Sequence, residues 1–204
     1  MKIVLFVEGK TETYLPQFFQ RWLAPPRVPA SVGIAAVNLR GVANYRSEIR
    51  KRTLVALAEP GVIGAIGLID FYASGLRYPA GNIWHQYNWA RQTIQSEVNH
   101  PRFRQHFAVH ETEAWLLSEP DNFPREISER LPKGAPESVN HRNPPSHVIA
   151  NAYQTRLQRR YKKPTEGAKL FAKLDPDRAS ERCPHLKLLL DEMLDLAKVN
   201  IVVR

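Results

Sequence analysis

The stretch KIVLFVEG, residues 2–9, determines the predicted fold class of the chain. Lys2 to Val7 form a nearly continuous apolar run, which is typical of a strand buried on both faces of a parallel sheet. Glu8 follows this run directly, and Gly9 breaks it. We therefore expect a buried strand near the N-terminus that places a carboxylate at its carboxyl end.

The same pattern recurs through residue 118. Apolar runs predict further strands at residues 33–39, 62–69 and 103–109, and helical spacing of apolar residues predicts helices at 11–23, 45–58, 83–98 and 113–117. Alternating strands and helices are typical of a parallel sheet with helices on both faces. We expect residues 1–118 to form an α/β core with a Rossmann-like, mostly parallel sheet of four strands between helices.

The character of the sequence changes after Pro120. Prolines crowd positions 120–145, and the later pattern predicts helices at residues 146–161, 166–173 and 185–198. Ser146 follows two prolines and is predicted to be a helix N-cap. Pro184 is predicted to lie in the first turn of the last helix. We expect residues 119–204 to form a helical C-terminal extension packed on the core.

Composition narrows the classes of function. The 204 residues include 29 Lys and Arg against 20 Asp and Glu, a formal charge of +9. Such a surplus favours a polyanionic partner such as nucleic acid, because binding releases counterions, although a generic basic surface would have the same charge. The basic residues gather in two segments, Arg46 to Arg52 and Arg156 to Lys163.

Two classes of protein are excluded by the same composition. A single cysteine, Cys183, allows neither an intramolecular disulfide nor a cysteine-based zinc cage. The early apolar run is too short for a signal-peptide core or a transmembrane helix. We expect a cytoplasmic protein with no membrane association.

The acids fall at informative positions. Three of the four predicted strands run directly into a carboxylate, namely Glu8, Asp70 and Glu111. Because sites in parallel α/β sheets form at the carboxyl ends of the strands, we expect these acids to converge. Glu12, one helical turn beyond Glu8, and Glu113 would join them. Clustered carboxylates need a cation among them, and Mg²⁺ or Mn²⁺ suits such oxygen ligands.

Any one of these acids would equally fit a helix cap, but the set as a whole favours a metal site. Other residues are candidates for binding phosphate. Gly9 would let a phosphate approach the backbone, and Lys10 would add a positive charge there. Arg77 lies in the loop after Asp70 and is a candidate phosphate contact. Arg159 and Arg160, from the second basic segment, are candidate contacts to nucleic acid.

Two short stretches look like known functional motifs but lack a residue that each motif requires. Gly9-Lys10-Thr11 looks like the end of a phosphate-binding P-loop, but Val4 stands where that motif requires glycine. His110-Glu111 begins like a helical zinc-protease motif, but Ala114 occupies the place of its second histidine. The sequence therefore predicts neither an ATPase nor a zinc protease.

The motifs that remain resemble a known family. The stretch VEGKTE, residues 7–12, resembles the first Toprim motif, which topoisomerases, primases and overcoming-lysogenization-defect nucleases share. The stretch IDFY, residues 69–72, and HETEAWLL, residues 110–117, resemble a narrower group of small, mostly bacterial Toprim-like proteins known as a domain of unknown function. Residues 136–140, 145–146 and 183–185 are also similar to that group, so the resemblance covers nearly the whole chain.

The resemblance implies a Toprim-like fold and roles for particular residues. Glu8 would act as general acid/base or as a metal ligand, and Asp70 would bind metal. Toprim proteins usually carry Asp-x-Asp at the third strand, but Tyr72 replaces the second Asp here. In related nucleases a later glutamate supplies the missing ligand, so Glu113 is the first candidate for this role and Glu111 the second.

We therefore expect a metal-dependent nuclease that hydrolyses phosphodiester bonds of DNA or RNA, with Glu8, Asp70 and Glu113 as catalytic residues. Relatives of the group often occur beside ABC-type ATPases in phage-defence systems, which implies an ATPase partner in trans. The alternative is a catalytically silent subunit that binds nucleic acid or the ATPase. A phosphohydrolase of small nucleotides would use the same acids, but the basic segments favour a polymer. The sequence is also compatible with a homo-oligomer.

Overall fold

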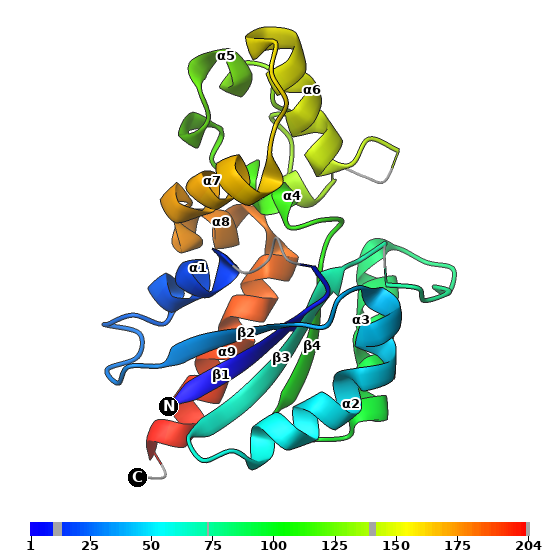
Figure 1. Cartoon of the computed structure of the whole chain (residues 1–204), viewed down its shortest axis with the longest axis vertical. Helices are drawn as coiled ribbons and strands as arrows, with labels where there is room; N and C mark the ends of the chain where they lie inside the picture. Colours follow the sequence, from blue (N-terminus) through cyan, green and yellow to red (C-terminus); the bar gives the residue numbers. More distant parts are fainter. Residues whose placement is uncertain (10–13, 73, 139–141, 203–204) are drawn as a thin grey trace.

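A four-stranded sheet forms the centre of the protein. The computed structural model describes residues 1–9, 14–72, 74–138 and 142–202. Its strands are β1 (Lys2–Val7), β2 (Gly33–Asn38), β3 (Val62–Asp70) and β4 (Phe103–Ala108). All three pairings are parallel, and the strand order is β2-β1-β3-β4 (Figure 1). The predicted α/β class and the parallel sheet of four strands are confirmed.

Helices connect these strands along the chain. They are α1 (Leu15–Trp22), α2 (Val42–Ala58) and α3 (Ile83–Val98). Residues 10–13, which the sequence placed near the start of the first helix, lie outside the described residues. Because each crossover returns to the same end of the sheet, every strand ends at the same edge.

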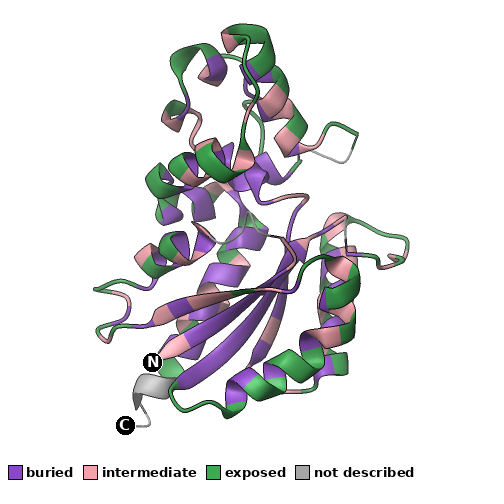
Figure 2. Cartoon of the chain, in the orientation of Figure 1, coloured by how far each residue is buried: buried purple, intermediate pink, exposed green. Residues whose placement is uncertain are grey.

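Side chains alternate between two hydrophobic cores. Ile3, Leu5 and Val7 of β1 belong to the core that also contains residues of α1 and the C-terminal helix. Val4 and Phe6 face the opposite core, which contains residues of α2 and α3. Figure 2 shows β1, β3 and β4 buried along most of their length, whereas β2 at the edge of the sheet is mostly half-buried. The continuous apolar runs in the sequence therefore reflect a sheet covered on both faces.

The last helix, α9 (Pro184–Val202), lies against the sheet although it comes from the C-terminal part of the chain. A Cβ atom on Gly64 of β3 would stand 2.8 Å from Cδ1 of Leu196, so glycine permits this close approach. Trp22 Nε1 also donates a hydrogen bond of 2.9 Å to the carbonyl of Leu190. The last helix thus completes one face of the core, and the boundary near residue 118 stays a prediction.

The rest of the C-terminal part is helical, as predicted. It contains α5 (Arg125–Ser128), α6 (Pro145–Leu157), α7 (Ala168–Lys173) and α8 (Pro176–Arg182), and α4 (Glu113–Leu116) precedes it, at the end of the predicted core. Figure 1 shows α5 and α6 at one end of the molecule, with α7 and α8 between them and the sheet. We call α5 and α6 with their connecting residues 129–138 and 142–144 the helical lobe. No helix of the described residues is long and apolar enough to cross a membrane.

One predicted cap is wrong. The N-cap of α6 is Pro144, and Ser146 lies inside the first turn. The reason is that Pro145 is itself the first helical residue, a position that suits proline because its missing N–H has no partner there in any case. The predicted start of the last helix is confirmed, since Pro184 is the first residue of α9.

Candidate active site at the carboxyl edge of the sheet

Glu8 and Asp70 stand at the same edge of the sheet. Val7 of β1 is in register with Leu68 of β3, so Glu8 and Asp70 lie within about one residue of the same level. Neighbouring strands are about 4.8 Å apart, which brings the two backbones close together. Both side chains are half-buried. The sequence placed these two acids at one edge, and the register agrees with that placement.

Glu111, three residues beyond β4, is bound to the start of α6. Its Oε2 accepts a hydrogen bond of 2.8 Å from the backbone N–H of Ser146, and its Oε1 accepts one of 3.1 Å from Ser146 Oγ. A carboxylate is stabilised at this position because the N-terminus of a helix carries partial positive charge. Glu111 therefore serves as a helix cap, and it ties α6 to the edge of the sheet.

Glu113 is the first residue of α4 and is fully buried. Its Oε2 lies 2.9 Å from Lys163 Nζ and 3.3 Å from Thr112 Oγ1. Its Oε1 is buried and has no hydrogen-bond partner among the described residues. Burial raises the pKa of Glu113, while the Lys163 ammonium opposes that rise. Glu113 is thus a buried carboxylate with one unsatisfied oxygen, an arrangement that costs folding free energy.

Tyr72 occupies the position where a second aspartate was expected. Burial raises its pKa to about 12, and the charges of Glu111 and Asp70 contribute to the rise. Its ring centroid is 4.9 Å from that of His110. Tyr72 therefore stays neutral at pH 7 and lies within electrostatic reach of two of the predicted ligands.

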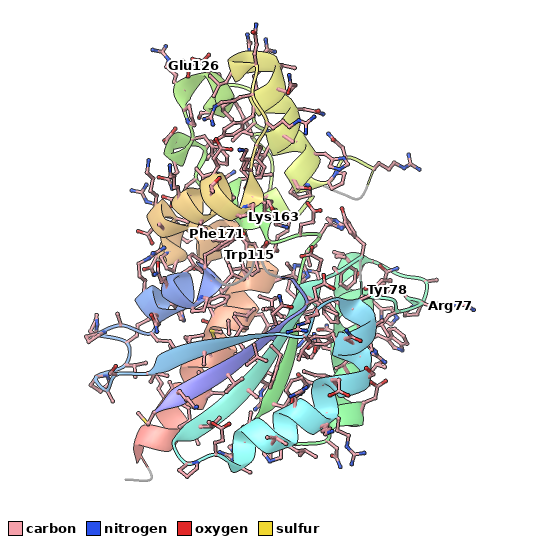
Figure 3. All side chains as sticks on the ribbon, in the orientation of Figure 1. Arg77, Tyr78, Trp115, Glu126, Lys163 and Phe171 are labelled. Carbon is pink, nitrogen blue, oxygen red and sulfur yellow. The ribbon has the colours of Figure 1, made fainter. Side chains whose placement is uncertain are left out.

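Two residues at this edge were not singled out by the sequence. Lys163 begins a π-helical turn, Lys163–Gly167, and reaches Glu113 from far along the chain. Tyr161 is close by: burial raises the pKa of its hydroxyl, and the charge of Glu113 adds to the rise. Figure 3 shows Lys163 near Trp115, between the helical lobe and the sheet. No periodicity or motif marks a contact of this kind, because the partners are distant in sequence.

Two other residues of this part of the molecule carry unsatisfied polar atoms. Trp115 Nε1 and the Tyr161 hydroxyl are buried and, like Glu113 Oε1, lack a hydrogen-bond partner within the ranges that the structure describes. A Cβ atom on Gly167 would lie 2.8 Å from the Tyr161 hydroxyl. Such atoms are rare in folded proteins, so each is a candidate contact for a ligand.

The predicted metal ligands are only partly brought together. In the described parts of the chain, no three His, Cys, Asp or Glu side chains are grouped closely enough to hold an ion. Glu12 and Lys10 lie outside the described residues. The oxygen donors of Glu8 and Asp70, together with the unsatisfied Oε1 of Glu113, are nevertheless of the type that Mg²⁺ and Mn²⁺ prefer. The donor atoms are of the right type for a hard divalent cation, but the described side chains do not bring three of them together around one ion.

The candidate phosphate contacts lie in different places. Gly9 follows Glu8 at the edge of the sheet and is half-buried. Arg77 is exposed in the loop between β3 and α3, where Figure 3 shows it pointing away from the protein. Arg159 forms an ion pair with Glu166, and its guanidinium lies 5.0 Å from the centroid of the Tyr153 ring. Arg160 is exposed and forms no ion pair with any described residue.

Solved structures of the C-terminal region of the OLD protein align with nearly the whole chain. The region from Xanthomonas campestris pv. campestris has 13% sequence identity and a TM-score of 0.47, and the match covers 97% of each chain. The region from Burkholderia pseudomallei has 14% identity and the same TM-score of 0.47, over 96% of this chain and 98% of that one. No curated protein sequence is significantly similar to this chain.

A match to a protein-family model identifies the family of the chain more clearly than these structural similarities do. The model described as Domain of unknown function (DUF4276) matches residues 7–194, which include Glu8, Asp70 and Glu113 as well as most of α9. The match confirms the resemblance to a domain of unknown function that the motifs at residues 69–72 and 110–117 indicated. The chain belongs to the DUF4276 family.

Proposed function

We propose that this protein is a metal-dependent nuclease that hydrolyses phosphodiester bonds of DNA or RNA at the carboxyl edge of its sheet. The observation that carries the proposal is Glu113 Oε1, a buried carboxylate oxygen without a partner among the described residues, on the edge where Glu8 and Asp70 also end their strands. Folding leaves such an atom unsatisfied where function requires it. An oxygen-rich site at the end of parallel strands is suited to phosphate chemistry.

We assign the following roles to the residues of the site. Asp70 and Glu113 would hold Mg²⁺ or Mn²⁺, and Glu8 would act either as a further ligand or as the general acid/base that moves a proton to or from the reacting oxygen. When bound, the metal supplies charge neutralisation at the phosphate and lowers the pKa of a coordinated water. Burial raises the pKa of Glu113, and Lys163, 2.9 Å away, opposes that rise by favouring the charged carboxylate. Arg77 would bind a phosphate outside the reacting position.

A second function is favoured by other contacts at the same edge. Lys163 already neutralises Glu113, Ser146 already occupies both oxygens of Glu111, and Tyr72 replaces a carboxylate. Carboxylates that already have partners within the protein gain less from binding a metal. The alternative is therefore a catalytically silent subunit that binds nucleic acid or an ABC-type ATPase in trans.

Cleavage and metal binding by the same variants separate the two functions. Labelled single-stranded DNA, duplex DNA and RNA are incubated with the protein and Mg²⁺ or Mn²⁺, and Mn²⁺ binding is measured by calorimetry. We expect Asp70→Asn to reduce the cleavage rate by about a thousandfold, because a metal ligand is lost, and Mn²⁺ affinity to fall with it. Glu8→Gln should reduce cleavage comparably.

The control is Glu126→Gln, which removes an exposed carboxylate of the helical lobe far from the sheet (Figure 3). It should leave both measurements unchanged. Wild-type protein that binds neither Mg²⁺ nor Mn²⁺ and cuts none of the substrates would contradict the nuclease and support the silent subunit. Cleavage that survives both Asp70→Asn and Glu8→Gln would place the active site elsewhere.

A further inference from the structure

A groove along α6, bounded on one side by Arg130 just after α5, lies outside the candidate active site. Its volume is about 460 Å³, and small side chains of α6 form part of its wall. The polar residues that line it are Arg130, Asn143, Asn151, Thr155 and Arg156. Among the residues that the structure describes, no acidic side chain lines the groove. A groove whose polar groups are guanidiniums, amides and one hydroxyl is suited to an anion.

The two arginines of the groove differ from other arginines nearby. Arg125 is paired with Glu129, and Arg178 with Glu119. Arg130 and Arg156 are exposed, and neither forms an ion pair with any residue that the structure describes. Two like charges on one groove repel each other, so both gain when an anion binds between them. The charge of the groove is therefore uncompensated by the protein itself.

The position of α6 connects the groove to the edge of the sheet. Glu111 holds the start of the helix through Ser146, and α6 then leads away to Arg156 near its other end. At about 1.5 Å per residue, this stretch of helix covers about 15 Å. That length corresponds to about four nucleotides of a helical strand at about 3.4 Å each. A strand that lies along α6 would thus reach the carboxyl edge where Glu8 and Asp70 stand.

We propose that the groove along α6 binds the phosphodiester backbone of the nucleic-acid strand that is cut at the edge of the sheet. This inference rests on the proposed nuclease function. Arg130 and Arg156 each contact a phosphate, and Asn143 and Asn151 donate hydrogen bonds to the backbone. Contacts of this kind hold a strand in register without reading its sequence.

Binding is measured in a protein that cannot cut, so that the result does not depend on catalysis. The double variant Arg130→Gln/Arg156→Gln is made in the Asp70→Asn background. Affinity for fluorescein-labelled single-stranded DNA, and for RNA of the same sequence, is measured by anisotropy over a salt titration. The matched control is Arg125→Gln/Arg178→Gln, which removes the same charge from arginines that have carboxylate partners.

We expect the groove variant to weaken binding about tenfold. The slope of log affinity against log salt should become shallower by about 1.4, because two phosphate contacts are lost. The control should change affinity less than about twofold. The DNA and RNA arms should respond alike, because the backbone phosphate is common to both.

Equal weakening by the groove variant and the control would overturn the inference, because it would show a general effect of charge. Unchanged binding in the groove variant would also overturn it, and continued metal-dependent cleavage by the protein with Asp70 intact would show that the nuclease function survives alone. Groove-dependent binding by a protein that never cuts would support the groove and overturn the nuclease. Absence of binding to any oligonucleotide would overturn both.

Discussion

Glu137 and Glu113 are both buried carboxylates, but their surroundings differ. Glu137, in the short turn Pro136–Ser138, caps the start of α9. It accepts hydrogen bonds of 3.0 Å from the N–H of His185 and 3.1 Å from that of Leu186, and it lies 2.8 Å from His185 Nδ1. Both of its oxygens are therefore satisfied. Glu113, at the carboxyl edge of the sheet, has one satisfied oxygen and one without a partner among the described residues.

The difference separates a structural acid from a functional one. A buried charge with complete hydrogen bonding stabilises the fold, because its desolvation is offset by its partners. A buried charge with an unsatisfied oxygen destabilises the fold and is retained where a ligand completes it. Substitutions at the two sites should therefore affect stability in opposite directions.

The largest effect is expected at the satisfied acid. Glu137→Ala should lower the free energy of unfolding by about 3 kcal/mol, because it leaves His185 and two backbone N–H groups of α9 without their acceptor. Urea unfolding followed by circular dichroism measures this change. The control, Glu126→Ala, removes an exposed carboxylate and should cost less than about 0.5 kcal/mol. A cost below about 1 kcal/mol at Glu137 would show that the cap contributes little.

A smaller effect with the opposite sign is expected at Glu113. Because burial raises the pKa of Glu113 in the folded protein, folding favours the protonated carboxyl, and wild-type stability falls as the pH rises through that pKa. Glu113→Gln mimics the protonated form. It should raise the free energy of unfolding by about 1 kcal/mol at about pH 8. The gain should vanish in acid, below the pKa of a glutamate in the unfolded chain.

Unfolding experiments at several pH values, with wild type and Glu113→Gln side by side, measure this difference. Lys163 is partly exposed and can turn to solvent when its partner becomes neutral. A loss of stability that is equal at every pH would show that the ion pair with Lys163 outweighs the cost of burial. In that case Glu113, like Glu137, would be a structural acid, and the comparison between them would fail.

The sheet was predictable because its signals are local. Each buried strand is a short apolar run, and three of the four runs lead within a few residues to an acid, so the sequence indicated both the fold class and the edge that carries Glu8 and Asp70. The family resemblance depended on the same local stretches. The last helix was also visible, because Pro184 marks its first turn.

The pairings of the acids were not predictable in the same way. Lys163 reaches Glu113, and Ser146 reaches Glu111, across long separations in sequence that leave no periodic signal. α8 was missed although Asp175-Pro176 is a regular helix start, in which Asp175 accepts a hydrogen bond from the N–H of Asp177. The helix has only seven residues, which is too short for its apolar spacing to be recognised.

The smallest effect is expected where Glu111 holds α6. Ser146→Ala removes the hydroxyl that donates to Glu111 Oε1, but the backbone N–H still donates to Oε2. We expect the free energy of unfolding to fall by about 0.7 kcal/mol, with Mn²⁺ affinity within about twofold of wild type. Ser47→Ala, which removes an exposed hydroxyl of α2 that donates to a backbone carbonyl, is the control.

Calorimetry with Mn²⁺ then tests which acid completes the site. Glu111 resembles Glu137, since both carboxylates accept hydrogen bonds from the first turn of a helix. An acid held in this way has little to gain from a cation, whereas Glu113 Oε1 has no described partner to lose. Tighter Mn²⁺ binding by Ser146→Ala would reverse this order, because it would show that the hydroxyl competes with the metal for Glu111. The missing ligand would then be Glu111, and Glu113 would serve only to hold Lys163.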